Sequence, residues 1–388
     1  MTTAHICIML AIIVYLGAML FVGYLCSKKN NDTSDFYLGG RKLGPLVTAM
    51  SAEASDMSSW LLMGLPGLAY LSGIADAGWT AIGLAIGTYL NWKIVAKKIR
   101  LYTHVAGNSI TLPSFFSNRF RDERRILQSI GAIFIVIFFI PYTASGFAAC
   151  GKLFASLFGV NYLTAMIISA VIIVAYTTLG GFLAASTTDF IQSIIMSIAL
   201  IIVFCFGISV AGGPDAVISH AKSLPGYLTM MTTYNPETGT EAAYPLINIV
   251  SMLAWGLGYF GMPHILLRFM AIEDEKKLSL SRRVATTGSL EMLQGSNSET
   301  IIVKIADLLS TYGVLPALLG GTILAGILAS TMSTADSQLL AASSAVSSDL
   351  LGSILKKKKR QETMLTDRVT LLLIAVIAVI IARNPDSS

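Results

Sequence analysis

The 388-residue sequence is poor in charge: only 13% of its residues are Asp, Glu, Lys or Arg. An ordinary soluble domain carries about 25%. In addition, 54% of the residues are hydrophobic and the mean hydropathy is +0.70. This composition is typical of a multi-pass membrane protein embedded in a lipid bilayer, and it excludes an ordinary soluble domain.

Cysteine and histidine are also scarce, with four residues of each. Cys7, Cys26, Cys150 and Cys205 are far apart and form no C-x-x-C pair, which argues against a disulfide framework or a metal site of that kind. The histidines show no H-E-x-x-H spacing, and no set of Ser, His and Asp residues suggests hydrolysis. We therefore expect that the protein is not an enzyme.

The net charge of +5 does not indicate a nucleic-acid partner, because Lys and Arg gather in short loops between apolar runs. That distribution is typical of cytoplasmic loops of membrane proteins. Residues 256–261 formally match G-x-G-x-x-G. No strand precedes them and no soluble βαβ unit surrounds them, so we reject a dinucleotide site.

Apolar runs long enough to span a bilayer occur along the whole chain. The first is followed by Lys28 and Lys29 and has no basic segment before it, so we interpret it as a retained helix with its N-terminus outside. The basic loops then lie in the cytoplasm, and 213–245 becomes an extracellular loop. The runs lie near residues 4–26, 45–71, 78–98, 127–150, 161–183, 189–212, 246–270, 312–350 and 369–383, of which the last is short.

Two of these runs, 45–71 and 246–270, are interrupted by glycine, proline and serine, and the first also contains an acid. Irregular backbone at membrane depth persists only where it is buried in protein or lines a cavity. Broken helices at corresponding places in two halves of a chain indicate a substrate site near the middle of the bilayer. The pattern predicts a transporter that forms a single transmembrane domain over residues 1–388.

The rule that basic loops lie in the cytoplasm cannot be met around the segment 284–311. The basic residues before it, from Lys276 to Arg283, and the cluster from Lys356 to Arg360 should both be cytoplasmic, but one apolar run joins them. Either a crossing is missing, or 312–350 forms a helix plus a re-entrant segment. The chain also stops at Asn384-Pro385-Asp386, just past an apolar run. We therefore expect an incomplete transporter with a gap at 284–311 and without its C-terminal helices.

Asp56 is the acid in the first broken run. A carboxylate at such a depth costs about 2.5–3.5 kcal/mol on insertion scales, so we expect it to face a cavity, an ion or a structural partner. The serines around it and the carbonyls freed by the break are neutral oxygen ligands. Such ligands suit a monovalent cation such as sodium better than calcium.

A second group of hydroxyls recurs at spacings of three and four residues, at Ser330, Ser333, Thr334 and Ser337. This spacing places them on one helical face, where they either bind an ion or allow close helix packing. Asp189 follows two glycines, and we expect it to cap a helix.

Aromatic residues mark the second broken run. Trp255 and Tyr259 are four residues apart, which predicts an apolar wall with one polar group on a single helical face, unless they belong to an interfacial belt. Tyr142, which follows Pro141, is a weaker candidate of the same type.

Three segments allow comparison with a known family: Asp35–Arg41 (DFYLGGR), Ser51–Gly67 (SAEASDMSSWLLMGLPG) and Trp255–His264 (WGLGYFGMPH). They closely resemble the bacterial sodium/proline symporters of the sodium:solute symporter family, and the resemblance extends along almost the whole chain. It implies an all-α, inverted-repeat fold like that of the leucine transporter, with 45–71 as the first core helix and 246–270 as the sixth. The seventh and tenth core helices, and those beyond the tenth, would be absent.

The resemblance also implies the site residues. Asp56 would be the acid needed for efficient sodium coupling, and Arg41 a cytoplasmic-side residue that affects it. The family usually has Ala where Ser330 stands. Sodium would be bound by the carbonyls of Ala54, Met57 and Ser330 and the hydroxyls of Ser333 and Thr334, and L-proline by Ser58, Tyr142, Trp255, Tyr259 and Pro263.

We therefore expect sodium-coupled uptake of L-proline by alternating access across a bacterial cell membrane. One alternative is a symporter of the same fold for another solute, such as a sugar, pantothenate or sialic acid. Another is a membrane sensor of the same fold, although no soluble domain of useful length is visible in the sequence.

Overall fold

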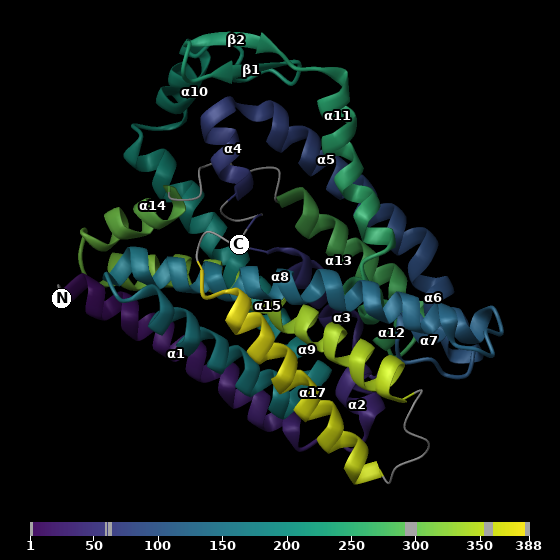
Figure 1. Cartoon of the computed structure of the whole chain (residues 1–388). Helices are drawn as coiled ribbons and strands as arrows, with labels where there is room; N and C mark the ends of the chain where they lie inside the picture. The colour runs from purple at the N-terminus through teal and green to yellow at the C-terminus, as the bar shows by residue number, and fades with distance from the viewer. Residues whose placement is uncertain (1–2, 59, 61–63, 292–300, 353–359, 385–388) are drawn as a thin grey trace.

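The computed structural model describes residues 3–58, 60, 64–291, 301–352 and 360–384, and this part of the chain is almost entirely helical (Figure 1). In chain order the elements are α1 (Thr3–Ser27), α2 (Thr33–Leu38), η1 (Gly39–Arg41), α3 (Pro45–Asp56), α4 (Leu65–Ser72), α5 (Ile74–Leu90), η3 (Asn91–Val95), α6 (Ala96–Val105), α7 (Leu112–Arg119), α8 (Ile126–Phe158), α9 (Tyr162–Val210), α10 (Pro214–Ser223), β1 (Thr232–Asn235), β2 (Thr240–Ala243), α11 (Leu246–Leu253), η4 (Ala254–Phe260), α12 (Pro263–Ala271), η5 (Glu275–Lys277), α13 (Leu278–Glu291), α14 (Ile301–Ser310), α15 (Val314–Ser344), η7 (Ala345–Leu351) and α17 (Arg360–Ile381).

The long helices pack side by side into one bundle (Figure 1). Helix α9 makes extensive contacts with α1, α8 and α15, and α17 packs against α8 and α15. One end of the bundle, here called the hairpin end, carries α10, β1 and β2. The opposite end, here called the basic end, is formed by η1, α6, α7 and the start of α13.

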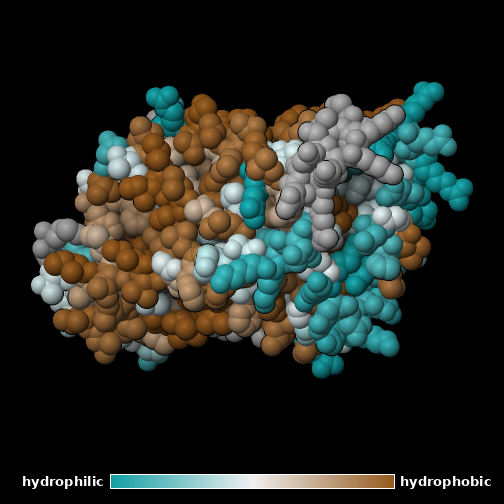
Figure 2. Space-filling view, turned by 90° about the horizontal axis from the view of Figure 1, so that it is seen from below, coloured by the Kyte–Doolittle hydropathy of each residue, from teal (hydrophilic) through white to brown (hydrophobic). Residues whose placement is uncertain are grey.

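Five helical segments of the described chain are long and apolar enough to cross a membrane, and the bent pair 246–260 and 263–271 makes a sixth. Large apolar side chains such as Ile13, Phe138 and Leu373 are exposed on the outside of these helices. Figure 2 shows apolar residues over most of one side of the molecule and hydrophilic residues gathered at one end. The protein is therefore a multi-pass membrane protein, as its composition predicts.

Helix α9 corrects the predicted boundary between 161–183 and 189–212, because no loop separates the two runs. The helix continues from Tyr162 to Val210 and is kinked at Gly181, whose φ of 57° and ψ of −150° are not helical. A straight helix of 49 residues would be about 74 Å long, more than twice the hydrocarbon thickness. The kink divides α9 into two segments that each have the length of one crossing.

One other prediction needs correction. Residues 314–351 form one continuous helical run, α15 followed by the π-helical turn η7, so the alternative of a re-entrant segment within 312–350 is wrong. The described chain is mostly helical, as predicted, and the loop 213–245 adds a two-stranded antiparallel hairpin in which Thr232 pairs with Ala243. The hairpin closes through residues 236–239, which include Pro236 and Gly239, as turns of this kind often do.

The two broken runs consist of separate helical pieces. Helix α3 ends at Asp56 and α4 begins at Leu65, while α11 passes into the 3₁₀ segment η4 before α12 begins at Pro263. The second run bends by 44°. A Cβ atom at Gly256 would collide with the Gly83 carbonyl, so η4 can lie directly against α5 only because both contact positions are glycine.

Helices α13 and α14 start at opposite ends of the bundle. The Ser281 hydroxyl of α13 donates to the Pro45 carbonyl at the start of α3, at the basic end (2.7 Å). Helix α14 lies near Gly207 and Gly320, where α9 ends and α15 begins, at the hairpin end. Ser281 and Ala306 therefore lie at opposite ends of the bundle.

Gly181→Ala tests the kink in α9. We expect the variant to lose about 1–3 kcal/mol from backbone strain alone, since the Gly181 conformation is open essentially only to glycine. The added Cβ would also lie 2.6 Å from the Phe36 carbonyl oxygen. Thermal unfolding of purified protein measures the loss. Gly17→Ala in α1 is the control, because its Cβ would meet no atom within 4 Å, and an equal effect of both variants would contradict the account.

Candidate functional site

The end of α3 meets the middle of α15 through a group of oxygen atoms. The Ser333 hydroxyl donates to the Ala54 carbonyl at 2.7 Å and lies 3.2 Å from the Ser330 carbonyl, to which Thr334 also donates at 3.1 Å. The Ser330 hydroxyl turns back to the Ile327 carbonyl of its own helix (2.8 Å), which leaves the Ser330 carbonyl facing the group. Four of the five residues expected to bind sodium are thus side by side.

Met57, the fifth expected residue, follows directly where the α3 helix stops. Its φ of −70° and ψ of 72° are not helical, and its N–H donates to the Glu53 carbonyl. Because the helix stops here, the last carbonyl groups of α3 have no N–H partner from a following helical turn.

Asp56 connects the two broken runs. The Tyr259 hydroxyl of η4 donates to the Asp56 carboxylate. The Asn91 side-chain amide of η3 in turn donates to the Tyr259 carbonyl at 2.9 Å. The polar partner of Asp56 is thus Tyr259, a residue of the expected proline pocket. Asp56 itself lies two residues after Ala54, whose carbonyl belongs to the oxygen group.

The remaining expected pocket residues surround the same break. Ser58 is buried and lies close to the Tyr142 hydroxyl of α8. The Trp255 ring stacks on Trp60, with ring centroids 4.3 Å apart and planes inclined by 10°. Pro263 begins α12 at the other side of η4.

Trp255 and Tyr259 do not share one face, contrary to the spacing argument. Residues 254–260 form a 3₁₀ helix, in which residues four apart are rotated by about 120° instead of lying one above the other. Accordingly, Trp255 is 46% exposed and Tyr259 is 5% exposed. A Cβ at Gly258 would meet no atom within 4 Å, so there is open space beside Tyr259.

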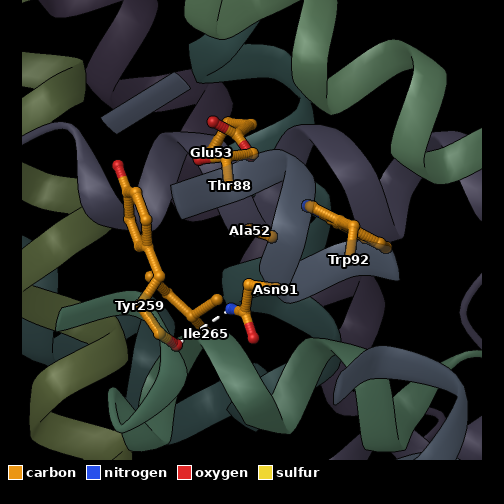
Figure 3. A pocket seen from close by; sticks show the side chains of 7 residues that line it. All are labelled: Ala52, Glu53, Thr88, Asn91, Trp92, Tyr259 and Ile265. Carbon is orange, nitrogen blue, oxygen red and sulfur yellow. Dashed lines mark hydrogen bonds between the residues drawn. The ribbon is translucent and has the colours of Figure 1, made fainter. Parts of the chain in front are cut away.

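A small cavity lies behind Tyr259 and has room for about one water molecule. Its lining comes from α3, α5, η3, η4 and α12 (Figure 3). It is too small for an amino acid, and it shares only Tyr259 with the expected proline pocket. The lining residues are Ala52, Glu53, Thr88, Asn91, Trp92, Tyr259 and Ile265.

Arg41 fastens three segments together at the basic end. Its guanidinium donates to the Thr103 hydroxyl (3.2 Å), the Met270 carbonyl (2.8 Å) and the Ser109 carbonyl (2.8 Å). Burial, followed by the nearby charge of Arg100, lowers the pKa of Arg41 to about 10, so it stays charged at neutral pH. The Arg41 side chain thus ties η1 to the end of α6, to Ser109 just after it, and to the end of α12.

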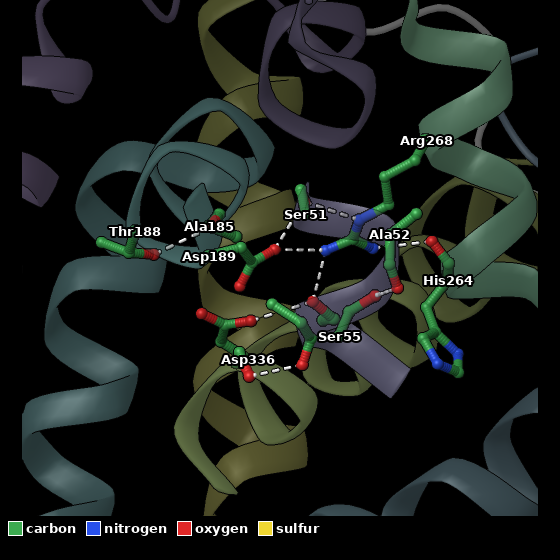
Figure 4. A network of polar contacts seen from close by, with 12 residues as sticks. Ser51, Ala52, Ser55, Ala185, Thr188, Asp189, His264, Arg268 and Asp336 are labelled. Atoms are coloured by element: carbon green, nitrogen blue, oxygen red, sulfur yellow. Dashed lines mark hydrogen bonds and ion pairs between the residues drawn. The ribbon is translucent and has the colours of Figure 1, made fainter. Parts of the chain in front are cut away.

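A buried ion pair joins α12 to α9 (Figure 4). Arg268 and Asp189 are 2.9 Å apart, and both side chains are almost fully buried. Ser51 of α3 donates to Asp189 (2.6 Å) and accepts from Arg268 (3.0 Å). Arg268 also donates to Ser337 of α15, whose hydroxyl donates to Asp336 at 3.0 Å. This network therefore holds four helices together.

Sequence reasoning missed Arg268 and assigned Asp189 wrongly. Asp189 lies inside α9 and does not cap a helix. The signal was present, because each residue is an isolated charge inside or at the edge of a predicted apolar run. Opposite charges in such positions indicate a pair, since neither is stable alone at membrane depth.

Comparison with known proteins places these features in a family. The model of the sodium:solute symporter family matches residues 36–298 and 292–388, which together cover most of the chain. The chain belongs to the sodium:solute symporter family. The resemblance expected from the three sequence segments is therefore confirmed.

Several bacterial relatives are similar over nearly the whole chain. Sodium/proline symporter 2 of Staphylococcus saprophyticus is 39% identical, and the match covers 97% of this chain and 75% of the relative. The sodium/proline symporter of Escherichia coli K12 is 38% identical over 96% of this chain and 76% of its own length. The osmoregulated proline transporter OpuE of Bacillus subtilis is 38% identical over 98% and 78%.

A solved structure has the same fold. A Na⁺-coupled sialic acid symporter in a substrate-bound outward-open state superposes with a TM-score of 0.79, covering 97% of this chain and 81% of that chain. The sequence identity is 17%, so the likeness concerns the fold alone.

Removing one partner of the Arg268–Asp189 pair tests the buried network. We expect Arg268→Leu and Asp189→Leu each to lose about 3–5 kcal/mol, because a buried charge is left without its partner. The double variant should lose much less than the sum. Denaturant unfolding of the four proteins in detergent measures the coupling, and additive losses would show that the pair does not act as a unit.

Proposed function

We propose that the protein takes up L-proline together with sodium by alternating access in a bacterial cell membrane, and that it has no enzymatic activity. The observation that carries the proposal is the contact between the Ser333 hydroxyl and the Ala54 carbonyl, where a broken helix meets α15. The proline transporters among the relatives support the same substrate. Another solute is less well supported, because the sialic acid symporter is only 17% identical.

The oxygen group suits sodium as the transported ion. Its members are neutral carbonyl and hydroxyl oxygens, and they converge from the end of α3 and one face of α15. Small hard cations prefer such oxygens, and a monovalent ion needs no cluster of carboxylates. In our proposal, sodium is held by the Ala54, Met57 and Ser330 carbonyls and the Ser333 and Thr334 hydroxyls.

Sodium binding would join α3 to α15 and so favour one arrangement of the bundle. A ligand shifts a conformational equilibrium only by binding the two states with different strength. An ion that needs ligands from both helices at once does so, because separating the helices removes ligands. The hydrogen bond from Tyr259 to Asp56 would pass this preference from the sodium group to the proline pocket.

The proline pocket in this proposal lies around the two breaks. The pyrrolidine ring would lie between the exposed Trp255 ring and the buried Tyr259 ring, which project from different faces of η4, beside the open position at Gly258. Ser58, Tyr142 and Pro263 would complete the pocket. The apolar ring suits aromatic walls, while the hydroxyls supply contacts for the charged amino and carboxyl groups.

The sodium gradient and the membrane potential can drive such uptake. One charge crossing 100 mV supplies about 2.3 kcal/mol. A roughly tenfold inward sodium gradient adds about 1.4 kcal/mol. Together they could maintain a proline gradient of several hundredfold.

Arg41, at the basic end, would affect the coupling of sodium binding to proline transport. It holds the end of α12 through the Met270 carbonyl, and α12 continues directly from the pocket residue Pro263. A fixed end of α12 would transmit movement at the break to the cytoplasmic loops.

We also propose that the chain lacks the seventh core helix, so that no full-length apolar helix joins the basic end at Ser281 to the hairpin end at Ala306. Helix α13 has 14 residues and so a length of about 21 Å, less than the roughly 30 Å hydrocarbon core. It also contains Arg282 and Arg283. The two family matches, which meet at residues 292–298, support a break at the same place.

Labelled proline uptake into vesicles tests the main proposal. An inward sodium gradient should drive uptake that a potassium gradient does not drive. We expect Ser333→Ala to raise the sodium concentration for half-maximal uptake about tenfold, because one ligand is lost.

Ser344→Ala is the matched control for Ser333→Ala. Its hydroxyl lies on the same helix and bonds the Ala341 carbonyl, outside the sodium group. Uptake that is indifferent to sodium, or equal effects of the two variants, would contradict the proposed sodium site.

Restoring a crossing tests the proposed gap. We expect insertion of an apolar segment of about 20 residues between residues 291 and 301 to increase sodium-dependent uptake, because it supplies a full span. A polar Gly/Ser insert of equal length is the control and should not help. If the unaltered chain shows sodium-dependent uptake and the apolar insertion abolishes it, the proposal that a core helix is missing is contradicted.

A further inference from the structure

Gln338 of α15 is a fully buried side chain whose amide nitrogen and amide oxygen both have no hydrogen-bond partner in the described part of the chain. Buried polar groups in folded proteins nearly always have partners, and an exception indicates a missing water, ion or ligand. A primary amide offers both a donor and an acceptor, so leaving both ends unpaired is costly.

The position of Gln338 links it to both proposed binding regions. It lies four residues after Thr334, so on the helix the two side chains are neighbours one turn apart. It also lies close to the Tyr142 hydroxyl of α8, which in turn is close to Ser58. The unpaired amide is therefore adjacent to the proposed sodium ligands and to the proposed proline pocket.

A second unpaired group lies near the same part of α8. His264 is almost fully buried, and its Nδ1 has no partner within the described residues. Its ring meets Phe139 edge to face, with ring centroids 5.4 Å apart. Phe139 is three residues before Tyr142, and His264 follows the pocket residue Pro263. Two buried polar side chains thus have unused atoms around one short stretch of α8.

We propose that Gln338 is a specificity-determining residue whose side-chain NH₂ donates to the carboxylate of the bound amino acid. This inference rests on the proposed function, because it assigns a new contact within the same pocket. A carboxylate accepts hydrogen bonds from neutral amides without a second buried charge, and bonds to a charged group are the stronger kind. The amide then gains the partner that it otherwise lacks.

Equilibrium binding of labelled L-proline to the purified full chain, in sodium and in potassium, tests this contact. Gln338→Leu should weaken proline binding at least tenfold. It should lower the unfolding temperature less than loss of a well-formed buried hydrogen bond does, because the described residues give the amide no partner in good hydrogen-bond geometry and only place it beside the Tyr142 hydroxyl. Gln338→Glu should weaken binding further, because a carboxylate then faces the substrate carboxylate.

Gln192→Leu is the matched control. Gln192 is also fully buried, but its amide donates to the Tyr15 hydroxyl at 2.8 Å. This variant should lower the unfolding temperature and leave the proline affinity unchanged. The pair of variants therefore separates loss of a substrate contact from loss of a structural hydrogen bond.

Each contrary result has its own meaning. Unchanged proline affinity in Gln338→Leu, with or without a lower unfolding temperature, overturns the contact and assigns the amide to structure or to a bound water. Tighter binding by Gln338→Glu overturns the carboxylate assignment, since the residue would then face the substrate's ammonium group. If the unaltered chain shows no sodium-dependent proline binding, the proposed function itself is contradicted, and Gln338 then has no bound proline to contact.

Discussion

The architecture depends on one constraint, namely that the carbonyl groups freed where α3 stops at Asp56 must find partners inside the bundle. Hydrocarbon offers none, so an unwound segment at this depth requires a neighbouring helix that supplies polar atoms. Helix α15 supplies them through Ser333, which donates to the Ala54 carbonyl. The break in α3 therefore requires the hydroxyl-bearing face of α15. The proposed sodium site lies where the two meet.

Two polar links of different character stand close together at this point. The Arg268–Asp189 pair joins α12 and α9 through buried charges and also binds Ser51 of α3 and Ser337 of α15, and separating the pair would leave a charge without a partner. The contact between Ala54 of α3 and Ser333 of α15 uses only neutral groups, so a single cation can strengthen it and loss of that cation can weaken it. We infer that the charged network holds the four helices together at the level of Ser51 and Ser337, while the neutral contact about one turn away, between Ala54 and Ser333, responds to sodium.

Much of this arrangement follows from local sequence, and the rest depends on tertiary packing. The break after Asp56 was predictable because glycine, proline and serine interrupt an apolar run, and the face shared by Ser330, Ser333 and Thr334 follows from helical periodicity. That Trp255 and Tyr259 lie on different faces was not predictable, because it follows from the 3₁₀ geometry of η4. That geometry goes with the close packing of Gly256 of η4 against α5, which is a tertiary contact. The pairing of Arg268 with Asp189 joins residues 79 positions apart, which no periodicity reveals. The kink at Gly181 was signalled by two glycines, but the apolar pattern suggested a boundary several residues later.

The most direct test of the central claim is amide hydrogen exchange of the purified protein in sodium and in potassium at equal ionic strength. If sodium joins the end of α3 to α15, sodium should selectively slow exchange in residues 54–58 and 330–334, while the segments that carry Arg268 and Asp189 exchange equally in both salts. Equal exchange of residues 54–58 and 330–334 in the two salts would contradict the claim that the ion binds between these helices.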